Sequence, residues 1–203
     1  MTHRGNHSHT QRMPAVDALQ VLADLSSADQ IVVTNQGSAR IFPKMRRRTL
    51  DFHYNPSTMG GAIPLALGLA LAQPNREVAV VSGDGSLLMT LGALVTVVRA
   101  GAKNFTVILL DNGIYEVTGG QQTPAPPAID YCGLARAAGF ASGDSFQDIA
   151  DWRAQAADAL SQPGPRFIRL AVEPVPGDYL RFPTPPIAEQ LAELRRALGA
   201  TGV

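Results

Sequence analysis

Residues 78–113 have the sequence VAVVSGDGSLLMTLGALVTVVRAGAKNFTVILLDNG, which predicts a strand, a helix and a second strand in succession. The two strands, Val78–Ser82 and Phe105–Leu110, are almost entirely apolar, which is typical of sheets that are covered on both faces. The helix between them, Thr90–Ala100, ends at Gly101. Elements in this order favour a right-handed crossover between two parallel strands.

The same alternation of strands and helices extends over most of the chain. Apolar runs predict further buried strands at Ile31–Thr34 and Arg166–Val172. Apolar residues at helical spacing predict helices at Pro14–Leu25, Ala62–Ala72, Ile129–Ala138, Phe146–Leu160 and Pro186–Leu198. The stretch Pro43–Pro56 is expected to be irregular. We therefore predict an α/β fold, a doubly wound parallel sheet with helices on both faces.

A chain of this size is expected to form one domain. Its 203 residues suit a single core, and neither an internal repeat nor a domain boundary is recognisable. The predicted organisation is a flexible tail over residues 1–12 followed by a single domain over residues 13–203. That domain ends in the helix predicted over residues 186–198.

The composition excludes several classes of protein. Apolar residues make up 45% and charged residues 17% of the chain, a balance that excludes intrinsic disorder. The 17 Lys and Arg residues are matched by 17 Asp and Glu residues, so no overall positive field attracts a nucleic acid or an anionic membrane. Apolar runs are shorter than the roughly 18 residues of a membrane span. The chain begins MTHRGNHSHTQR, which contains no apolar segment of the kind that a secretion signal requires.

Two further features bear on metals and redox chemistry. His3, His7 and His9 lie in the first segment, where a polar terminus is favoured over a metal-binding tract. Cys132 is the only cysteine, which excludes an intramolecular disulfide and does not by itself hold an iron–sulfur cluster or a structural zinc ion. Its apolar helical context predicts an inert buried thiol. These features favour a protein of the reducing cytoplasm.

Polar clusters follow both strands of the opening stretch. Gly83-Asp84-Gly85-Ser86 follows one strand and Asp111-Asn112-Gly113 follows the other, at the ends where open α/β sheets bind ligands. A carboxylate and a side-chain amide are oxygen ligands suited to Mg²⁺, and Asp84 and Asn112 form such a pair. Gly85 allows a phosphate to approach the backbone, and Ser86 is able to donate a hydrogen bond. The pattern predicts a magnesium-bound diphosphate.

Each cluster alone has a purely structural interpretation, because Asp-Gly and Asn-Gly are common in turns. The occurrence of both clusters, each at the end of an apolar strand, favours a ligand-binding site over two unrelated turns. Gly85 and Asn112 are separated by 26 residues, the length of one helix and one strand. This pattern resembles the thiamine-diphosphate-binding signature, in which GDG is followed by an Asn at the end of the next strand.

Within that superfamily, the chain resembles the diphosphate-binding domain of the decarboxylase and acetolactate-synthase group. The resemblance rests on Met59-Gly60-Gly61-Ala62-Ile63-Pro64 and on Gly83–Met89. The run Asp111-Asn112-Gly113-Ile114-Tyr115, continued by Thr118-Gly119-Gly120-Gln121, is most similar to sulfopyruvate and phosphonopyruvate decarboxylases. In two-subunit sulfopyruvate enzymes this domain is a separate short chain.

The resemblance implies roles for individual residues. Asp84 and Asn112 become side-chain ligands of Mg²⁺, and the backbone carbonyl of Ile114 a third ligand. Met59 occupies the position whose bulky side chain bends the cofactor, and Ser57 the position whose backbone carbonyl receives the aminopyrimidine. That second position is often Gly in the family, so the local conformation at Ser57 is left open. The candidate cofactor-binding residues are Gly37, Ser38, Met59, Gly83, Asp84, Gly85, Ser86, Asn112, Ile114 and Tyr115.

The resemblance also implies a partner. In the family, a glutamate of a second domain, normally from the neighbouring subunit, activates the cofactor. The glutamates of this chain are Glu77, Glu116, Glu173, Glu189 and Glu193, and none has the expected sequence context. The segment before Thr58 is too short for another domain. We therefore expect half of an active site, completed by a separate pyrimidine-binding subunit in a hetero-oligomer.

The implied reaction is thiamine-diphosphate-dependent decarboxylation of a small 2-oxo acid, with a sulfopyruvate- or phosphonopyruvate-like substrate as the leading hypothesis. An acetolactate-synthase-like carboligase subunit remains an alternative. So does a non-catalytic cofactor-binding subunit. A nucleotide-binding module and the short subunit of a ferredoxin-linked oxidoreductase are weaker alternatives, the latter because its cluster needs more cysteines.

Residues that contact the substrate are harder to predict. Arg46-Arg47-Arg48, His53 and Tyr54 precede Met59, and an arginine cluster is able to bind a sulfonate, phosphonate or carboxylate. For most of that run, a solvated face or an intersubunit contact is the favoured interpretation. Three residues after the predicted metal loop are candidates for the substrate side or for loop packing, namely Tyr115, Glu116 and Gln121.

Overall fold

The centre of the protein is a six-stranded sheet, seen in a computed structural model that describes residues 12–124 and 129–199. Its strands are β1 (Ile31–Asn35), β2 (Asp51–Tyr54), β3 (Val78–Gly83), β4 (Phe105–Asp111), β7 (Ser142–Phe146) and β8 (Arg166–Ala171). A separate antiparallel ribbon consists of β5 (Ile114–Tyr115) and β6 (Gln121–Gln122), with the 3-10 turn η1 (Glu116–Thr118) between them. The α-helices are α1 (Ala15–Leu25), α2 (Gln36–Met45), α3 (Ala62–Ala72), α4 (Asp84–Leu88), α5 (Ala93–Ala100), α6 (Tyr131–Ala138), α7 (Ile149–Ser161), α8 (Gly177–Leu180) and α9 (Ile187–Ala197).

The strands lie in the order β2-β1-β3-β4-β8-β7, and every neighbouring pair is parallel. In the middle of the sheet, Val80 of β3 lies opposite Val33 of β1 and Val107 of β4. The chain first places β2 on one side of β1 and then β3 on the other side. Ligands of open α/β sheets bind at the carboxyl ends of strands beside such a reversal. The predicted fold class is confirmed.

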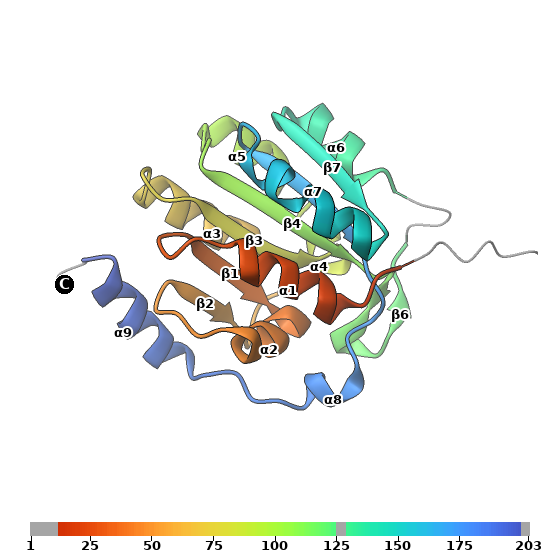
Figure 1. Ribbon diagram of the computed structural model, residues 1–203, viewed down its shortest axis with the longest axis horizontal. Coiled ribbons are helices and arrows are strands. Elements are labelled where there is room, and N and C mark those ends of the chain that lie inside the picture. Colours follow the sequence, from red (N-terminus) through yellow and green to blue (C-terminus); the bar gives the residue numbers. More distant parts are fainter. Residues whose placement is uncertain (1–11, 125–128, 200–203) are drawn as a thin grey trace, which may run out of the picture.

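Helices cover both faces of the sheet and form two apolar cores (Figure 1). On one face α1, α2 and α7 pack against the strands, and on the other α3, α5 and α6 do so. Successive residues of β3 serve opposite cores, Val80 in one and Val81 in the other. Full burial of a valine side chain stabilises the fold by about 1.5–3 kcal/mol. Because successive side chains of these apolar strands point to opposite faces of the sheet, each strand packs against both helical layers.

Helix α9 lies beside the outer edge of β2 (Figure 1). Its Gln190 is buried and bonds the edge strand through both ends of its side-chain amide. Oε1 accepts the backbone N–H of His53 at 2.7 Å, and Nε2 donates to the backbone oxygen of the same residue at 3.1 Å. Nε2 also donates to the backbone oxygen of Pro185 at 2.7 Å. The amide thus makes the bonds that a further strand would make.

Two predictions of local structure are wrong. Pro43–Pro56 is not irregular throughout, because α2 extends to Met45 and β2 occupies Asp51–Tyr54. The helix expected from Phe146 begins at Ile149, because Phe146 ends the unpredicted strand β7. Both missed strands lie at the edges of the sheet that the described residues form, β2 beside β1 and β7 beside β8.

The chain ends can be compared only in part with the predictions. Most of the predicted tail, with His3, His7 and His9, lies outside the described residues. Arg12 donates hydrogen bonds to the backbone oxygens of Asp111 and Val172. The helix predicted over residues 186–198 corresponds to α9. Among the described residues, no helix combines the length and apolar character that crossing a membrane requires.

Candidate functional site

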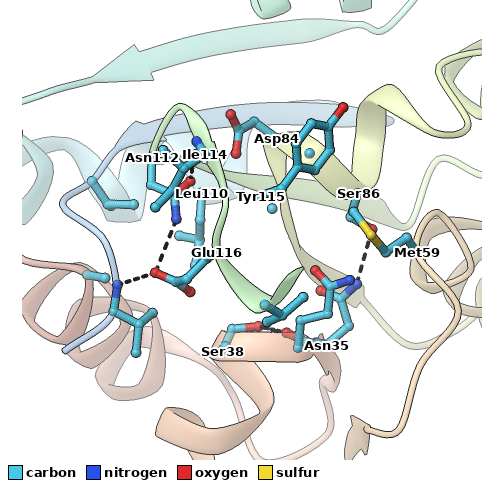
Figure 2. A pocket seen from close by; sticks show the side chains of 18 of the residues that line it. Asn35, Ser38, Met59, Asp84, Ser86, Leu110, Asn112, Ile114, Tyr115 and Glu116 are labelled. Atoms are coloured by element: carbon cyan, nitrogen blue, oxygen red, sulfur yellow. Dashed lines mark hydrogen bonds between the residues drawn. The ribbon is translucent and has the colours of Figure 1, made fainter. Parts of the chain in front are cut away.

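A pocket that is partly open to solvent lies at the carboxyl ends of β1, β3, β4 and β8 (Figure 2). It is adjacent to the reversal between β1 and β3. Its polar lining consists of Asn35, Gln36, Ser38, Asp84, Ser86, Asn112, Tyr115, Glu116 and Glu173. Apolar side chains, including Met59 and Val175, complete the lining. The sheet therefore brings together side chains that are far apart in the sequence.

Asp84 starts α4 and is only 1% exposed. Its Oδ2 accepts the backbone N–H of Gly113 at 3.1 Å and the hydroxyl of Thr123 at 3.4 Å. Burial, and secondly the charge of Asp111, raise the pKa of Asp84 to about 6. Within the described part of the chain, no Lys, Arg or His forms an ion pair with this carboxylate. A cation in the pocket would stabilise its ionised form.

Asn112 follows β4 and is held at both ends of its amide. Oδ1 accepts the backbone N–H of Ile114 at 3.0 Å, and Nδ2 donates to Oε1 of Glu116 at 3.3 Å. The same oxygen of Glu116 accepts the backbone N–H of Val175 at 2.5 Å. Burial, the largest cause, raises the pKa of Glu116. These bonds connect the loop after β4 to the segment that follows β8.

Gly85 lies directly under the ring of Tyr115. A Cβ atom at position 85 would lie 2.6 Å from Cδ1 of that ring, closer than atoms of real side chains approach. Figure 2 shows the ring between Asp84 and Ser86, at the start of α4. The close approach that a glycine permits is thus used within the protein itself, between α4 and the ribbon of β5.

Ser86 connects the end of β1 with the turn that carries Met59. Its hydroxyl oxygen accepts the side-chain N–H of Asn35 at 3.2 Å and the backbone N–H of Gly60 at 2.9 Å. The carbonyl of Gly60 accepts the hydroxyl of Thr90 at 3.1 Å. Gly60 has a φ of +85°, a conformation that favours glycine. These bonds fix the turn that places Met59 in the pocket lining.

The turn from β1 to α2 carries backbone strain beside the pocket. Gln36 has a φ of +51°, a left-handed conformation that costs a residue with a side chain about 1 kcal/mol. Next to it, the hydroxyl of Ser38 donates to the carbonyl of Asn35 at 2.7 Å and accepts the N–H of Asn35 at 3.2 Å. Oδ1 of Asn35 is buried and has no partner among the described residues. The turn therefore holds an unsatisfied acceptor at the pocket.

The pocket contains every predicted cofactor-binding residue and every predicted metal ligand. Ser57 is not part of the lining, and the role of its carbonyl stays a prediction. Of the three candidates after the metal loop, Tyr115 and Glu116 line the pocket, whereas Gln121 is exposed on β6. Asn35, which ends β1, and Gln36, which begins α2, also line it and were not predicted, because the apolar run before them gives no sign that it ends at a ligand site.

The interpretation of Arg46-Arg47-Arg48 as mainly a solvated face or intersubunit contact needs correction. Arg46 forms an ion pair with the buried Asp51 at 2.8 Å, and Arg48 lies 3.6 Å from the same carboxylate. Both also donate to carbonyls at the end of α1. A buried carboxylate needs such counter-charges, so these arginines support the start of β2. His53 is buried and bonded to Thr34 at 2.8 Å.

Cys132 is buried in α6 and its thiol donates to the backbone oxygen of Asp144 at 3.2 Å. Burial raises the thiol pKa, which keeps the thiol protonated and unreactive at neutral pH. This agrees with the predicted inert thiol.

The pocket suits a metal held jointly by the protein and a ligand. The described residues contain no group of three His, Cys, Asp or Glu side chains that would bind a metal unaided. Asp84 and Asn112 offer one carboxylate and one amide oxygen, a set that leaves several positions of Mg²⁺ for phosphate oxygens and water. The buried carboxylate without a counter-charge and the unsatisfied oxygen of Asn35 fit a cationic and hydrogen-bonding ligand.

A protein-family model described as "Thiamine pyrophosphate enzyme, C-terminal TPP binding domain" matches residues 32–170. The chain belongs to this family. The matched range in this thiamine pyrophosphate enzyme domain includes Asn35, Met59, Asp84 and Asn112. The resemblance seen in the GDG and DNG motifs is therefore confirmed.

Two relatives are decarboxylases. The chain is 36% identical over 184 residues to the phosphonopyruvate decarboxylase of Streptomyces viridochromogenes, a match that covers 91% of this chain and 45% of that protein. It is 38% identical over 147 residues to the beta subunit of sulfopyruvate decarboxylase from Methanothermobacter thermautotrophicus, covering 72% of this chain and 75% of that subunit. The chain thus spans less than half the length of the first relative and most of the second.

A solved structure with the same fold is the benzoylformate decarboxylase of Polynucleobacter necessarius. It superimposes with a TM-score of 0.68 at 20% identity, over 78% of this chain and 33% of that chain. At this identity the likeness concerns the fold alone.

Proposed function

We propose that this chain binds thiamine diphosphate and Mg²⁺ as the diphosphate-binding subunit of a 2-oxo acid decarboxylase. The observation that carries the proposal is the meeting of Asp84 and Asn112 at one pocket in a chain of the thiamine pyrophosphate enzyme family. Sulfopyruvate or phosphonopyruvate is the proposed class of substrate, on the basis of the two decarboxylase relatives. The chain from residue 13 onward would form one domain for this purpose.

In this proposal the metal ligands are Asp84, Oδ1 of Asn112 and the backbone carbonyl of Ile114. Both side chains offer hard oxygen atoms, which Mg²⁺ prefers. The Gly113 N–H that bonds Asp84 lies between the other two ligands in the sequence. The loop after β4 would therefore hold the ion against the start of α4.

The remaining pocket residues would bind and shape the cofactor. Thiamine diphosphate, when bound, supplies the electron sink for loss of carbon dioxide. The proposed contacts of its diphosphate are Gly37, Ser38, Gly83, Gly85, Ser86 and Tyr115. Met59 would pack against its centre and enforce a bent shape, since Gly60 is held by Ser86 and Thr90. The carbonyl of Ser57 would accept a hydrogen bond from its aminopyrimidine.

A separate pyrimidine-binding subunit would supply the activating glutamate. Glu116 lines the pocket, but its carboxylate is engaged by Asn112 and Val175. Relatives named as beta subunits of sulfopyruvate decarboxylase support a two-chain enzyme. Exposed apolar side chains on neighbouring helices α3, α5 and α6 give such a partner a surface to cover, namely Leu71, Val95 and Leu134.

Titration calorimetry tests the cofactor proposal. Thiamine diphosphate is expected to bind in the presence of Mg²⁺ and much more weakly with EDTA. ADP with Mg²⁺ serves as the comparison, because it presents the same diphosphate on a different organic group. Tighter binding of ADP would reject the proposal in favour of a nucleotide-binding module.

Purification of the native complex tests the partner and the reaction. Mass spectrometry is expected to find a second α/β chain, and the complex is expected to release carbon dioxide from sulfopyruvate or phosphonopyruvate. Formation of acetolactate from pyruvate would show that the complex is a carboligase and would overturn the proposed decarboxylase activity. Decarboxylation by this chain alone would contradict the proposal that it contains only half of the active site.

A further inference from the structure

We propose that Glu116 is a positioning residue that orients the side-chain amide of Asn112, so that its oxygen and not its nitrogen is presented to the Mg²⁺ of the proposed function. An amide has two ends of nearly equal shape, and only the oxygen end is able to bind a metal. The side chain must therefore be held in one of two orientations. The inference rests on the proposed function for the identity of the ion and on the bonds of Glu116 for the orientation.

Two bonds hold the ends of the Asn112 amide apart. The backbone N–H of Ile114 only donates, so the end of Asn112 that it meets at 3.0 Å must be Oδ1. Nδ2 is the opposite end, and it donates to Oε1 of Glu116 at 3.3 Å. The same loop also holds the Gly113 N–H that bonds Asp84. The two oxygens proposed as ligands are thus fixed by one loop.

Glu116 is itself held from two further directions. Its Oε1 accepts the N–H of Val175, in the segment that leads from β8 to α8. Its Oε2 lies over Gly37, where a Cβ atom would be only 2.7 Å away. The carboxylate therefore sits between the loop after β4, the start of α2 and the segment after β8. Such outer partners of a metal ligand typically change metal affinity by about 10- to 100-fold when removed.

A double-mutant cycle separates orientation from general support of the loop. E116A removes one of the two bonds that orient the Asn112 amide and leaves the bond from the Ile114 N–H, and the apparent Kd for Mg²⁺ with saturating thiamine diphosphate is expected to rise about 10-fold. E116Q keeps an acceptor oxygen for Asn112 and Val175, so a rise of no more than about threefold is expected. N112D needs no orientation, because both ends of a carboxylate are oxygen, but it faces Glu116 with a like charge.

The size of the Glu116 effect in the two backgrounds is decisive. E116A is expected to weaken Mg²⁺ binding about 10-fold when residue 112 is Asn, and by no more than about threefold in the N112D background, where only the charge of Glu116 is lost. If E116A weakens binding equally in both backgrounds, or in neither, the positioning role is overturned. Equal losses in E116A and E116Q would assign the effect to charge and would also overturn it.

A ligand-free measurement keeps this inference apart from the proposed function. In ¹H–¹⁵N spectra, the side-chain NH₂ signals of Asn112, identified by their loss in N112D, are expected to shift in E116A, and the Val175 N–H to exchange at least tenfold faster. Unchanged signals would overturn the inference even if the cofactor binds. If the wild-type chain binds no thiamine diphosphate with Mg²⁺ while these signals change, the proposed function fails and the bonds of Glu116 stand.

Discussion

The ring of Tyr115 rests on Gly85, so closely that a Cβ at position 85 would lie 2.6 Å from the ring. We expect G85A to destabilise the chain by about 1–3 kcal/mol, because the ring must move from its packed position. In the Y115A background the same change is expected to be neutral or stabilising, since Ala is a better helix former. Urea unfolding of the four variants measures this coupling.

The control for this prediction is Gly68 of α3, whose position has open space where a Cβ would be added. G68A is expected to stabilise the chain by about 1 kcal/mol through helix propensity alone. Additive effects of G85A and Y115A would contradict the proposed contact.

Asp84 gives a prediction in which stability and binding change in opposite directions. D84N keeps an oxygen for the Gly113 N–H and removes a buried charge, so the ligand-free chain is expected to melt at the same or a higher temperature. The Mg²⁺-dependent binding of thiamine diphosphate is expected to fall by roughly 100-fold, because an ionised ligand is lost. Calorimetry and thermal unfolding measure the two effects.

D29N is the matched control, because Asp29 is exposed and forms a surface ion pair with Arg76. It is expected to leave cofactor binding unchanged. A large fall in melting temperature of D84N would show that the carboxylate supports the fold rather than a bound cation.

The buried imidazole of His53 is expected to make the protein less stable in acid. Burial, and then the charges of Arg46 and Arg47, lower its pKa to about 4, compared with 6.5 in the unfolded chain. The unfolded state therefore binds a proton first, and the stabilisation present above pH 6.5 is lost as the pH falls from 6.5 to 4. The full effect is up to about 3 kcal/mol.

H53Q tests this assignment, because glutamine is able to bond Thr34 but does not titrate in this range. Urea unfolding at pH 7 and pH 4.5 is expected to show a loss of free energy about 2–3 kcal/mol smaller in H53Q than in the wild type. Parallel pH profiles for the two proteins would assign the acid sensitivity to other groups.

The exposed apolar side chain of Val95 predicts a contact with the partner subunit. V95D is expected to weaken assembly with the partner at least tenfold, since a charge would be buried in the interface. Binding of thiamine diphosphate to the separate chain is expected to remain. Leu25, exposed on α1 on the opposite face of the sheet, provides the control variant L25D. Equal weakening by both variants, measured by analytical ultracentrifugation, would argue against this surface.

The central part of the fold was predictable because its strands are buried on both faces. Val78–Val81 and Val107–Leu110 are uninterrupted apolar runs, and Pro74 and Gly101 separate the two strands from the helices that precede them. The edge strands were missed for the opposite reason. Asp51–Tyr54 and Ser142–Phe146 mix polar with apolar residues, and their stability depends on partners far away in the sequence, such as Gln190 for the first.

The site was predictable where its chemistry is local and not where it depends on distant segments. Asp84 and Asn112 occur in recognisable motifs at strand ends. The bond from Val175 to Glu116 joins residues 59 positions apart, and the bond from Asn35 to Ser86 joins residues 51 positions apart. No pattern within either segment indicates these contacts, so they follow only from the folded arrangement.

The amide of Gln190 also has a consequence for self-association. An open sheet edge offers unpaired N–H and carbonyl groups to strands of other molecules, which is a common route to aggregation. By occupying both groups of His53, this one side chain shields the edge from intermolecular strand addition. A chain shortened before α9 would display a bare edge, and its tendency to form fibrils or disordered precipitates would rise with concentration.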